Sequence, residues 1–84
     1  MFECEVLTVR DVNFKDQTGK EVVGSKLYVI AECNENGWNG YEIADFWFGD
    51  GHVLESFVSS LTHGDKIIIE FNRKGRPSHI QLVE

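Results

Sequence analysis

The stretch DFWFGDGHVLESFVSSLTHGDKIIIEF, residues 45–71, decides the fold, because its hydrophobic period changes twice along its length. It opens inside an aromatic-rich segment, residues 41–48, whose side chains favour a strand. The Gly-Asp-Gly cluster at 49–51 ends that strand with a turn. Residues 66–71, KIIIEF, are rich in β-branched side chains and too few for a helix, so they predict a second strand.

Between these two strands the sequence predicts one amphipathic helix. Apolar side chains recur from Val53 to Leu61 on one stripe of a 3.6-residue period, while Glu55 and several serines occupy the opposite face. Asp50 is placed to act as the N-cap, and Gly64 suits the left-handed position that often ends a helix. The expected helix is about three turns long.

The remaining segments predict three further strands. Residues 2–14 alternate at first and then lose the pattern, as in a long strand that bends or bulges. After a turn at 17–20, the second strand spans residues 26–33, with Gly24–Ser25 as a further break or bulge, and the last strand spans residues 78–84. The side chains expected to face the core are Phe2, Cys4, Val6, Leu27, Val29, Ala31, Cys33, Ile67, Ile69, Phe71, Ile80 and Leu82. In the third strand both faces carry large apolar side chains, and the favoured inward set is Ala44, Phe46 and Phe48.

The element order is therefore β-β-β-α-β-β, an all-β chain whose one helix lies between strands three and four. Among small barrels this order favours the OB-fold, a five-stranded β-barrel in which that helix covers the open end. An SH3-like barrel has at most a short helical turn, later in the chain. Closing or nearly closing the sheet also protects the strand edges of so small a core. With 84 residues, the chain is expected to form a single OB-fold domain, residues 1–84.

Composition and motifs narrow the function classes. Hydrophobic residues make up 42% of the chain, and no apolar run approaches the roughly 20 residues of a membrane helix. The opening residues lack the order of a signal peptide, so the expected compartment is the cytoplasm, without membrane contact. Cys4 and Cys33 show no metal-ligand spacing with each other or with the histidines, which predicts reduced thiols and neither metal nor cofactor. No Ser-His-Asp set, P-loop, HExxH or CxxC motif is present, so no enzymatic activity is expected.

Two segments carry a resemblance to known DNA-binding proteins. The run Trp47-Phe48-Gly49, the helix, and then Gly64-Asp65-Lys66-Ile67-Ile68-Ile69-Glu70 resembles the matching segment of bacterial single-stranded-DNA-binding proteins. The earlier half, with Gly19-Lys20 followed by Gly24-Ser25-Lys26-Leu27-Tyr28, is similar to the small DNA-binding proteins of filamentous phages. As residue type and spacing, the resemblance covers most of the chain. It implies an OB-fold protein that coats single-stranded DNA, stacking bases on strand-borne aromatic side chains while loops hold phosphates.

Charge opposes this function overall but favours it locally. The formal net charge is −6, whereas phosphate binding depends on cations. Between Leu27 and Asp65, however, the chain has seven acidic residues and no Lys or Arg. The bases fall in or near the two loops that an OB-fold uses to hold oligonucleotides, and the candidate phosphate contacts are Lys15, Lys20, Lys26, Arg73, Lys74 and Arg76. Folding is expected to gather a local positive rim on an acidic body.

Four aromatic side chains are candidates for base stacking: Tyr28, Trp38, Tyr41 and Trp47. Stacking on such a ring is worth about 1–3 kcal/mol per base and tolerates any sequence. For Tyr28 and Trp47 the alternative role is ordinary packing in the barrel. Trp38 lies in a loop rich in Asn and Gly, where an exposed Trp suggests a contact, although it could also anchor the loop on the barrel.

Two hypotheses of different classes follow. The first is sequence-independent binding of single-stranded DNA in the replication or transfer of a phage, plasmid or conjugative element; RNA stays open, because recognition of the 2′-hydroxyl needs geometry that spacing does not show. The second is an OB-like protein-interaction or regulatory module whose acidic face meets a basic partner through Glu32, Glu35, Glu42 or Asp45. The many apolar side chains expected at the surface also predict a homodimer with two-fold symmetry.

Overall fold

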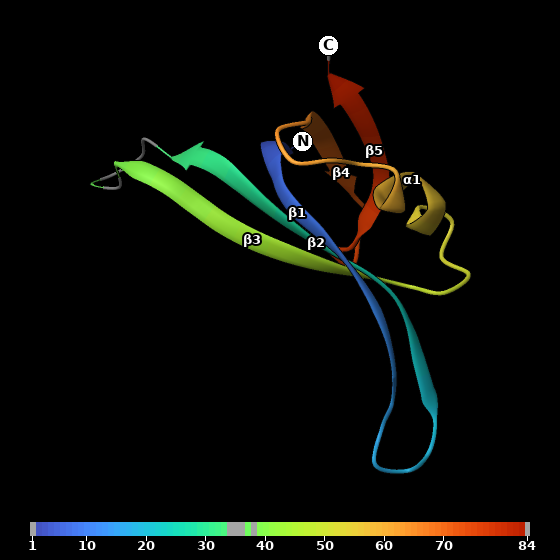
Figure 1. Cartoon of the computed structure of the whole chain (residues 1–84). Helices are drawn as coiled ribbons and strands as arrows, with labels where there is room; N and C mark the ends of the chain where they lie inside the picture. Colours follow the sequence, from blue (N-terminus) through green and yellow to red (C-terminus); the bar gives the residue numbers. More distant parts are fainter. Residues whose placement is uncertain (1, 34–36, 38, 84) are drawn as a thin grey trace.

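The computed structural model describes residues 2–33, 37 and 39–83. Its elements are β1 (Phe2–Lys15), β2 (Glu21–Cys33), β3 (Gly40–Gly49), α1 (Glu55–Ser59), β4 (Lys66–Phe71) and β5 (Pro77–Val83). All five strands pair antiparallel in one sheet, in the order β3-β2-β1-β4-β5. The all-β fold, and the single helix between the third and fourth strands, confirm the sequence prediction (Figure 1).

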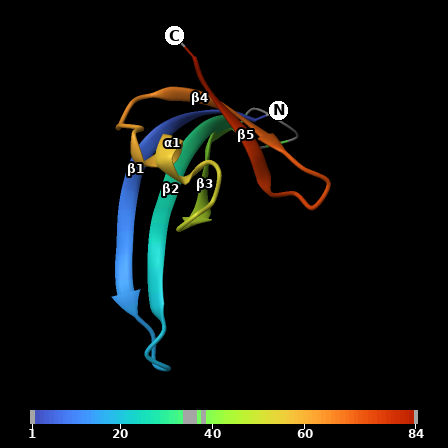
Figure 2. The same cartoon turned by 90° about the vertical axis from the view of Figure 1, so that its right-hand side faces the viewer.

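The central strand, β1, changes partner along its length. Residues 2–5 pair with β4, and residues 5–15 pair with β2. The sheet therefore has a β1-β2-β3 part and a β4-β5 part that cross each other (Figures 1 and 2). Within the described residues no ladder joins β3 to β5, so hydrogen bonds do not close the sheet. The described residues therefore form one open, five-stranded antiparallel sheet.

A β-bulge at Leu7 bends β1 and changes which of its side chains face the core. The register to β2 shifts between Val6 and Thr8, which confirms the predicted bulge. Val6 is buried before the shift, and Val9 packs against the core after it. Three bonds from the turn before β4 hold the bend: Val6 N to Asp65 O at 2.8 Å, Gly64 N to Val6 O at 2.9 Å, and His63 Nδ1 to Leu7 O at 2.9 Å. Because a carbonyl oxygen only accepts, His63 carries a proton on Nδ1.

Beyond the register pair Val12 and Gly24, where the pairing with β3 ends, β1 and β2 continue as a two-stranded arm, residues 13–23, which ends in the loop 16–20 (Figures 1 and 2). The pairing runs through the arm without a shift. The break expected at Gly24–Ser25 is therefore wrong, since both residues stay in the ladder with β1. The glycine has a different use, because the ring of Trp47 approaches its backbone closely.

Ser25 ties the base of the arm to the helix. Its side chain is fully buried, and its hydroxyl lies 3.1 Å from Glu55 Oε1 and 3.4 Å from Asp11 Oδ1. The single hydroxyl proton serves one carboxylate at a time, and the shorter distance favours Glu55. A buried hydroxyl is thus satisfied by the first turn of α1.

The helix is shorter than the three turns that the sequence predicts. α1 has five residues, and no side chain caps it, so Asp50 is not its N-cap. Turns occupy most of the segment before it, where Gly51 takes a φ of 86°. Val53 consequently stays 85% exposed instead of joining the apolar stripe, and Val58 is the residue that α1 buries fully. Gly64 does take a positive φ of 92°, but in the turn before β4 rather than at the end of the helix.

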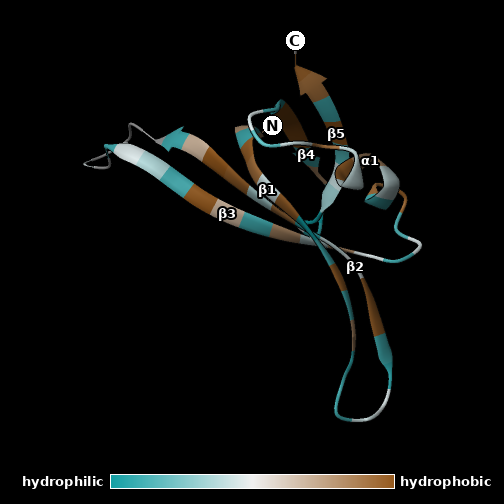
Figure 3. Ribbon diagram, viewed as in Figure 1, coloured by the Kyte–Doolittle hydropathy of each residue, from teal (hydrophilic) through white to brown (hydrophobic). Residues whose placement is uncertain are grey.

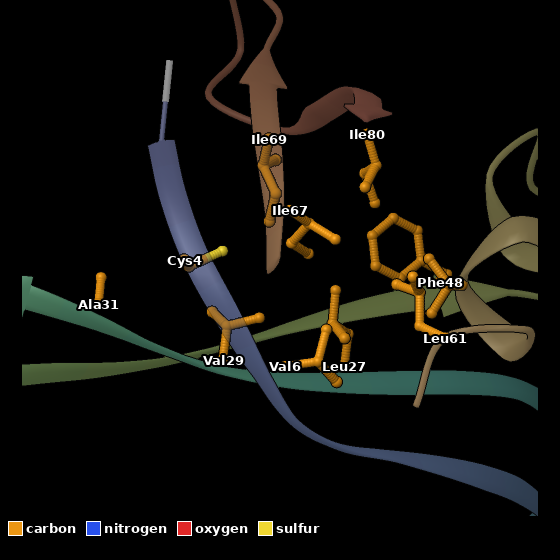
Figure 4. Packing of buried hydrophobic residues seen from close by; sticks show 11 residues of the cluster. Cys4, Val6, Leu27, Val29, Ala31, Phe48, Leu61, Ile67, Ile69 and Ile80 are labelled. Carbon is orange, nitrogen blue, oxygen red and sulfur yellow. The ribbon is translucent and has the colours of Figure 1, made fainter. Parts of the chain in front are cut away.

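The buried side chains form one cluster between the sheet and α1, namely Cys4, Val6, Leu27, Val29, Ala31, Phe48, Val58, Leu61, Ile67, Ile69 and Ile80 (Figure 4). Phe48 is fully buried, and Ala44 and Phe46 pack against the cluster, which confirms the predicted inward face of β3. Two expected core residues lie at its margin: Phe71 is 38% exposed and Leu82 is 45% exposed. The sheet is open there, and the Phe71 ring packs on Phe46 with the centroids 5.7 Å apart. No helix in the described part of the chain is long and apolar enough to cross a membrane.

Candidate nucleic-acid interface

The face of β1–β3 that points away from the core, here called the outer face, carries three of the predicted stacking residues. Successive side chains of a strand alternate between faces. Because Phe46 and Phe48 point inward, Tyr41 and Trp47 point outward, and Tyr28 does so from β2 by the same alternation. Trp47 is 46% exposed, Tyr41 is 73% exposed, and Tyr28 is partly exposed. None of these three rings is enclosed in the core.

The Trp47 ring rests on a pair of glycines. Gly24 of β2 and Gly49 of β3 are register partners, two positions along β3 from Trp47. A Cβ placed on Gly24 would stand 2.8 Å from Cζ2 and from Cη2 of the Trp47 ring, and one on Gly49 would stand 3.5 Å from its Nε1. The indole therefore lies directly over the backbone at Gly24. An aromatic ring held in this way offers bases a platform that needs little ordering on binding.

Lys26 stands between two aromatic side chains of the outer face. Its Nζ lies 3.1 Å from Asp45 Oδ2 and 5.5 Å from the centroid of the Tyr28 ring. The hydrogen bond with Asp45 is the first cause, and Tyr28 the second, of a pKa for Lys26 above its ordinary value of 10.5. Lys26 thus stays protonated, but Asp45 offsets part of its charge.

The outer face is hollowed where the arm leaves the core. The hollow has a volume of about 420 Å³ and is lined by Arg10, Val12, Phe14, Val22, Lys26, Tyr28 and Trp47. Apolar residues continue from β1 and β2 onto the arm (Figure 3). Sequence reasoning misses Arg10 and Phe14, because they reach this face only through the shift in alternation at the Leu7 bulge. The one signal for Phe14, 53% exposed, is a large aromatic side chain just before a polar turn.

The two predicted basic loops share one backbone structure. In each, the first residue accepts N–H bonds from the third and fifth residues through its side-chain oxygen, at 2.9 and 3.0 Å for Asp16 and at 2.9 and 3.1 Å for Asn72. The fourth residue is a glycine with positive φ, 82° at Gly19 and 75° at Gly75. The fifth residue is a base in both loops. In each loop the side chain of the first residue therefore holds the backbone in place, and the basic side chains are exposed to solvent.

The predicted basic residues do not all gather at the outer face. Exposed in the β4–β5 loop are Arg73, Lys74 and Arg76. No described carboxylate lies within ion-pair distance of these three side chains. Figure 2 shows this loop far from the loop of the arm, which lies at the lower end of the view. Lys20 is exposed in the loop at the end of the arm, whereas Lys15 alternates with Phe14 and so faces the other side of the arm.

Other titratable groups offer no further site. Cys4 is buried, and its burial raises the pKa of the thiol from 9.0 to about 11, which keeps it protonated at neutral pH. In the parts of the chain that the structure describes, no three His, Cys, Asp or Glu residues are grouped so that they could hold a metal ion. The predicted contact Trp38, the acidic Glu35 and the side chain of Cys33 lie outside the described residues.

No family model matches the sequence, and neither the curated proteins nor the solved structures compared with this chain give a match.

Proposed function

We propose that this chain binds single-stranded nucleic acid, DNA in the first place, across the outer face and without sequence preference. One observation carries the proposal: Tyr28 and Trp47 border one hollow of the outer face, with Trp47 fixed on Gly24, and Tyr41 lies farther along β3 on the same face. Every base has a π-face, so each ring can contribute about 1–3 kcal/mol per stacked base whatever the sequence.

Cations on the outer face support the proposal. Arg10 and Lys26 are register partners there, and the β4–β5 loop, which follows Phe71, carries three further bases. The acidic residues that give the net charge of −6 act on phosphates only within the Debye length, which is about 8 Å at physiological ionic strength. Asp45, Glu5 and Glu32 lie on the outer face themselves, so we expect phosphates beside Arg10, which no described carboxylate pairs with, and not along the whole face. Coating unpaired DNA during replication or transfer of a phage, plasmid or conjugative element is the role that the resemblance implies.

The proposal is tested by a fluorescence titration with oligo-dT at low salt. In a Trp38→Phe background Trp47 is the only indole, and we expect its emission to be quenched as bases stack on it. Replacing Arg73, Lys74 and Arg76 with Gln should lower the slope of log affinity against log salt by about 2, since each phosphate contact on a single strand contributes about 0.7.

Lys15→Gln is the control, because it removes charge from the side of the arm opposite the outer face and should leave the slope nearly unchanged. The alternative function, a module that meets a basic partner through Glu32, Glu42 or Asp45, predicts no quenching by oligo-dT. Absence of quenching at low salt would contradict nucleic-acid binding. An equal response to oligo-dT and oligo-U would extend the proposal to RNA.

A further inference from the structure

The hollow at the root of the arm has two kinds of wall. Three aromatic side chains, Phe14, Tyr28 and Trp47, border it, and two valines complete its apolar part. Arg10 and Lys26 supply positive charge beside them. Flat apolar rings next to cations suit a ligand that is itself a flat ring joined to an anion, which is the chemistry of a nucleotide.

The size of the hollow restricts the occupant to about one such unit. At about 420 Å³ it lies at the lower end of the range for small-molecule sites, roughly 300–1,000 Å³. The hollow is open to solvent on the outer face, so a nucleotide can enter while it remains part of a longer strand. The arm prolongs the outer face here, past the register pair Gly24 and Val12.

Charge singles out Arg10 within the hollow. Lys26 is held at 3.1 Å by Asp45 and is partly neutralised, whereas no described carboxylate lies within ion-pair distance of Arg10. Arg10 and Lys26 are register partners on neighbouring strands, so an anion beside Arg10 also lies near Lys26. A guanidinium can donate two parallel hydrogen bonds to a phosphate, which favours it as the anion-binding group.

We propose that this hollow is a subsite for one nucleotide of the bound strand, with the base on Trp47, the phosphate at Arg10 and Phe14 closing the far side. The inference rests on the proposed function and extends the path of the strand from β2 and β3 onto the arm. The alternative occupant of the hollow is an apolar side chain from a second copy of the chain. Such a side chain would contact Phe14, but it would not bind the positive charge of Arg10.

Two variants in β1 test the subsite, with oligo-dT as the probe and Trp47 as the only indole. Phe14→Ala should weaken binding roughly 5- to 150-fold, the factor that corresponds to one stacked base at about 1–3 kcal/mol. Arg10→Gln should lower the salt slope by about 0.7, one phosphate contact. Lys15→Gln is the matched control, since it removes the same charge from the same strand on the opposite face of the arm and should leave the slope unchanged.

A second measurement uses the unaltered chain and thymidine 5′-monophosphate. Amide resonances of Arg10 and Phe14 and the indole N–H of Trp47 should shift, while those of the β4–β5 loop should not. If wild-type protein ignores oligo-dT, the proposed function and the subsite both fail. If oligo-dT binds wild type but Arg10→Gln and Phe14→Ala behave like Lys15→Gln, only the subsite is overturned. The subsite also fails if Phe14→Ala changes the sedimentation of the protein but not its affinity for oligo-dT.

Discussion

At the scale of single residues, Trp47 owes its position to a neighbour without a side chain. Trp47 cannot lie over β2 unless Gly24 leaves its Cβ space empty, because a Cβ there would stand 2.8 Å from the ring. The same Cβ would stand 2.5 Å from the backbone oxygen of Phe48, which cannot move freely inside a ladder. Gly24 is therefore required for the platform and not only tolerated by the strand.

Gly24→Ala is expected to displace the Trp47 ring and to lower the free energy of unfolding by about 1–3 kcal/mol, the usual cost of overpacking. Urea denaturation measures the loss, and in a Trp38→Phe background the emission of Trp47 should shift to longer wavelength as the ring becomes hydrated. Gly49→Ala is the matched control, because its Cβ meets Trp47 only at an ordinary contact distance of 3.5 Å. Equal effects of the two substitutions would show that the ring does not depend on Gly24.

The sequence predicts single residues well where strict alternation holds. Tyr41 and Trp47 are exposed and Tyr28 is partly exposed, all on the face away from the core as expected, because regular pairing in β2 and β3 preserves the period of two. The sequence does not predict that Arg10 and Phe14 lie on the outer face. The bulge that turns their side chains outward depends on hydrogen bonds from the turn 62–65, far along the chain. Local patterns carry no information about such a partner.

At the scale of elements, the two hairpin loops reach the same backbone structure with different first residues. Asp16 and Asn72 each accept two backbone N–H bonds, and Asp16 also accepts one from the Thr18 hydroxyl at 2.6 Å. That hydroxyl bond first, and then the Lys20 amide, lower the pKa of Asp16 below its ordinary value of 3.8. Of these two loops, the loop of the arm is therefore the one whose first residue loses its charge in acid.

We expect the arm's loop to loosen in acid while the β4–β5 loop does not. The carboxylate form of Asp16 accepts the bonds, so their contribution is complete above pH 3.8 and is lost as the pH falls through the lowered pKa. Amide chemical shifts of Thr18 and Lys20, followed by NMR from pH 6 downwards, measure the transition. In Asp16→Asn the amide can still accept these bonds as Asn72 does, and the transition should vanish. Persistence of the transition in that variant would assign it to another group.

Elements were predictable where the hydrophobic period is unambiguous. The helix and the two strands that flank it follow from the change of period in residues 41–71, whereas the length of the helix does not. The sequence pattern places Val53 in the apolar stripe of the helix. In the structure, turns occupy the segment around Gly51, so α1 has only five residues and Val53 is exposed. The expected break at Gly24 failed for a related reason, since a glycine that signals a turn in sequence here accommodates a ring.

At the scale of the whole molecule, the open sheet leaves part of the core at the surface. Hydrogen bonds do not join β3 to β5 among the described residues, and Phe71 and Leu82 are 38% and 45% exposed near the β4-β5 part of the sheet. Apolar surface of this kind is stabilised when a second copy covers it. The homodimer predicted from the sequence would use this margin, which is distinct from the outer face.

Sedimentation equilibrium at tens of micromolar is expected to give twice the monomer mass of 9.6 kDa. Leu82→Arg should return the protein to a monomer, because the dimer would then bury an unpaired charge. Val53→Arg makes the same change at a residue that is 85% exposed and should leave the dimer intact. A wild-type monomer at several hundred micromolar would rule out this assembly.

Amide chemical-shift mapping with oligo-dT at low salt tests most directly whether a single strand lies on the outer face. We expect the largest changes at Lys26, Tyr28, Asp45 and the indole N–H of Trp47, with smaller ones in the β4–β5 loop, and little change in α1 or at the core residue Val29. Changes confined to acidic positions such as Glu42, or no change at any oligonucleotide concentration, would contradict nucleic-acid binding by this face.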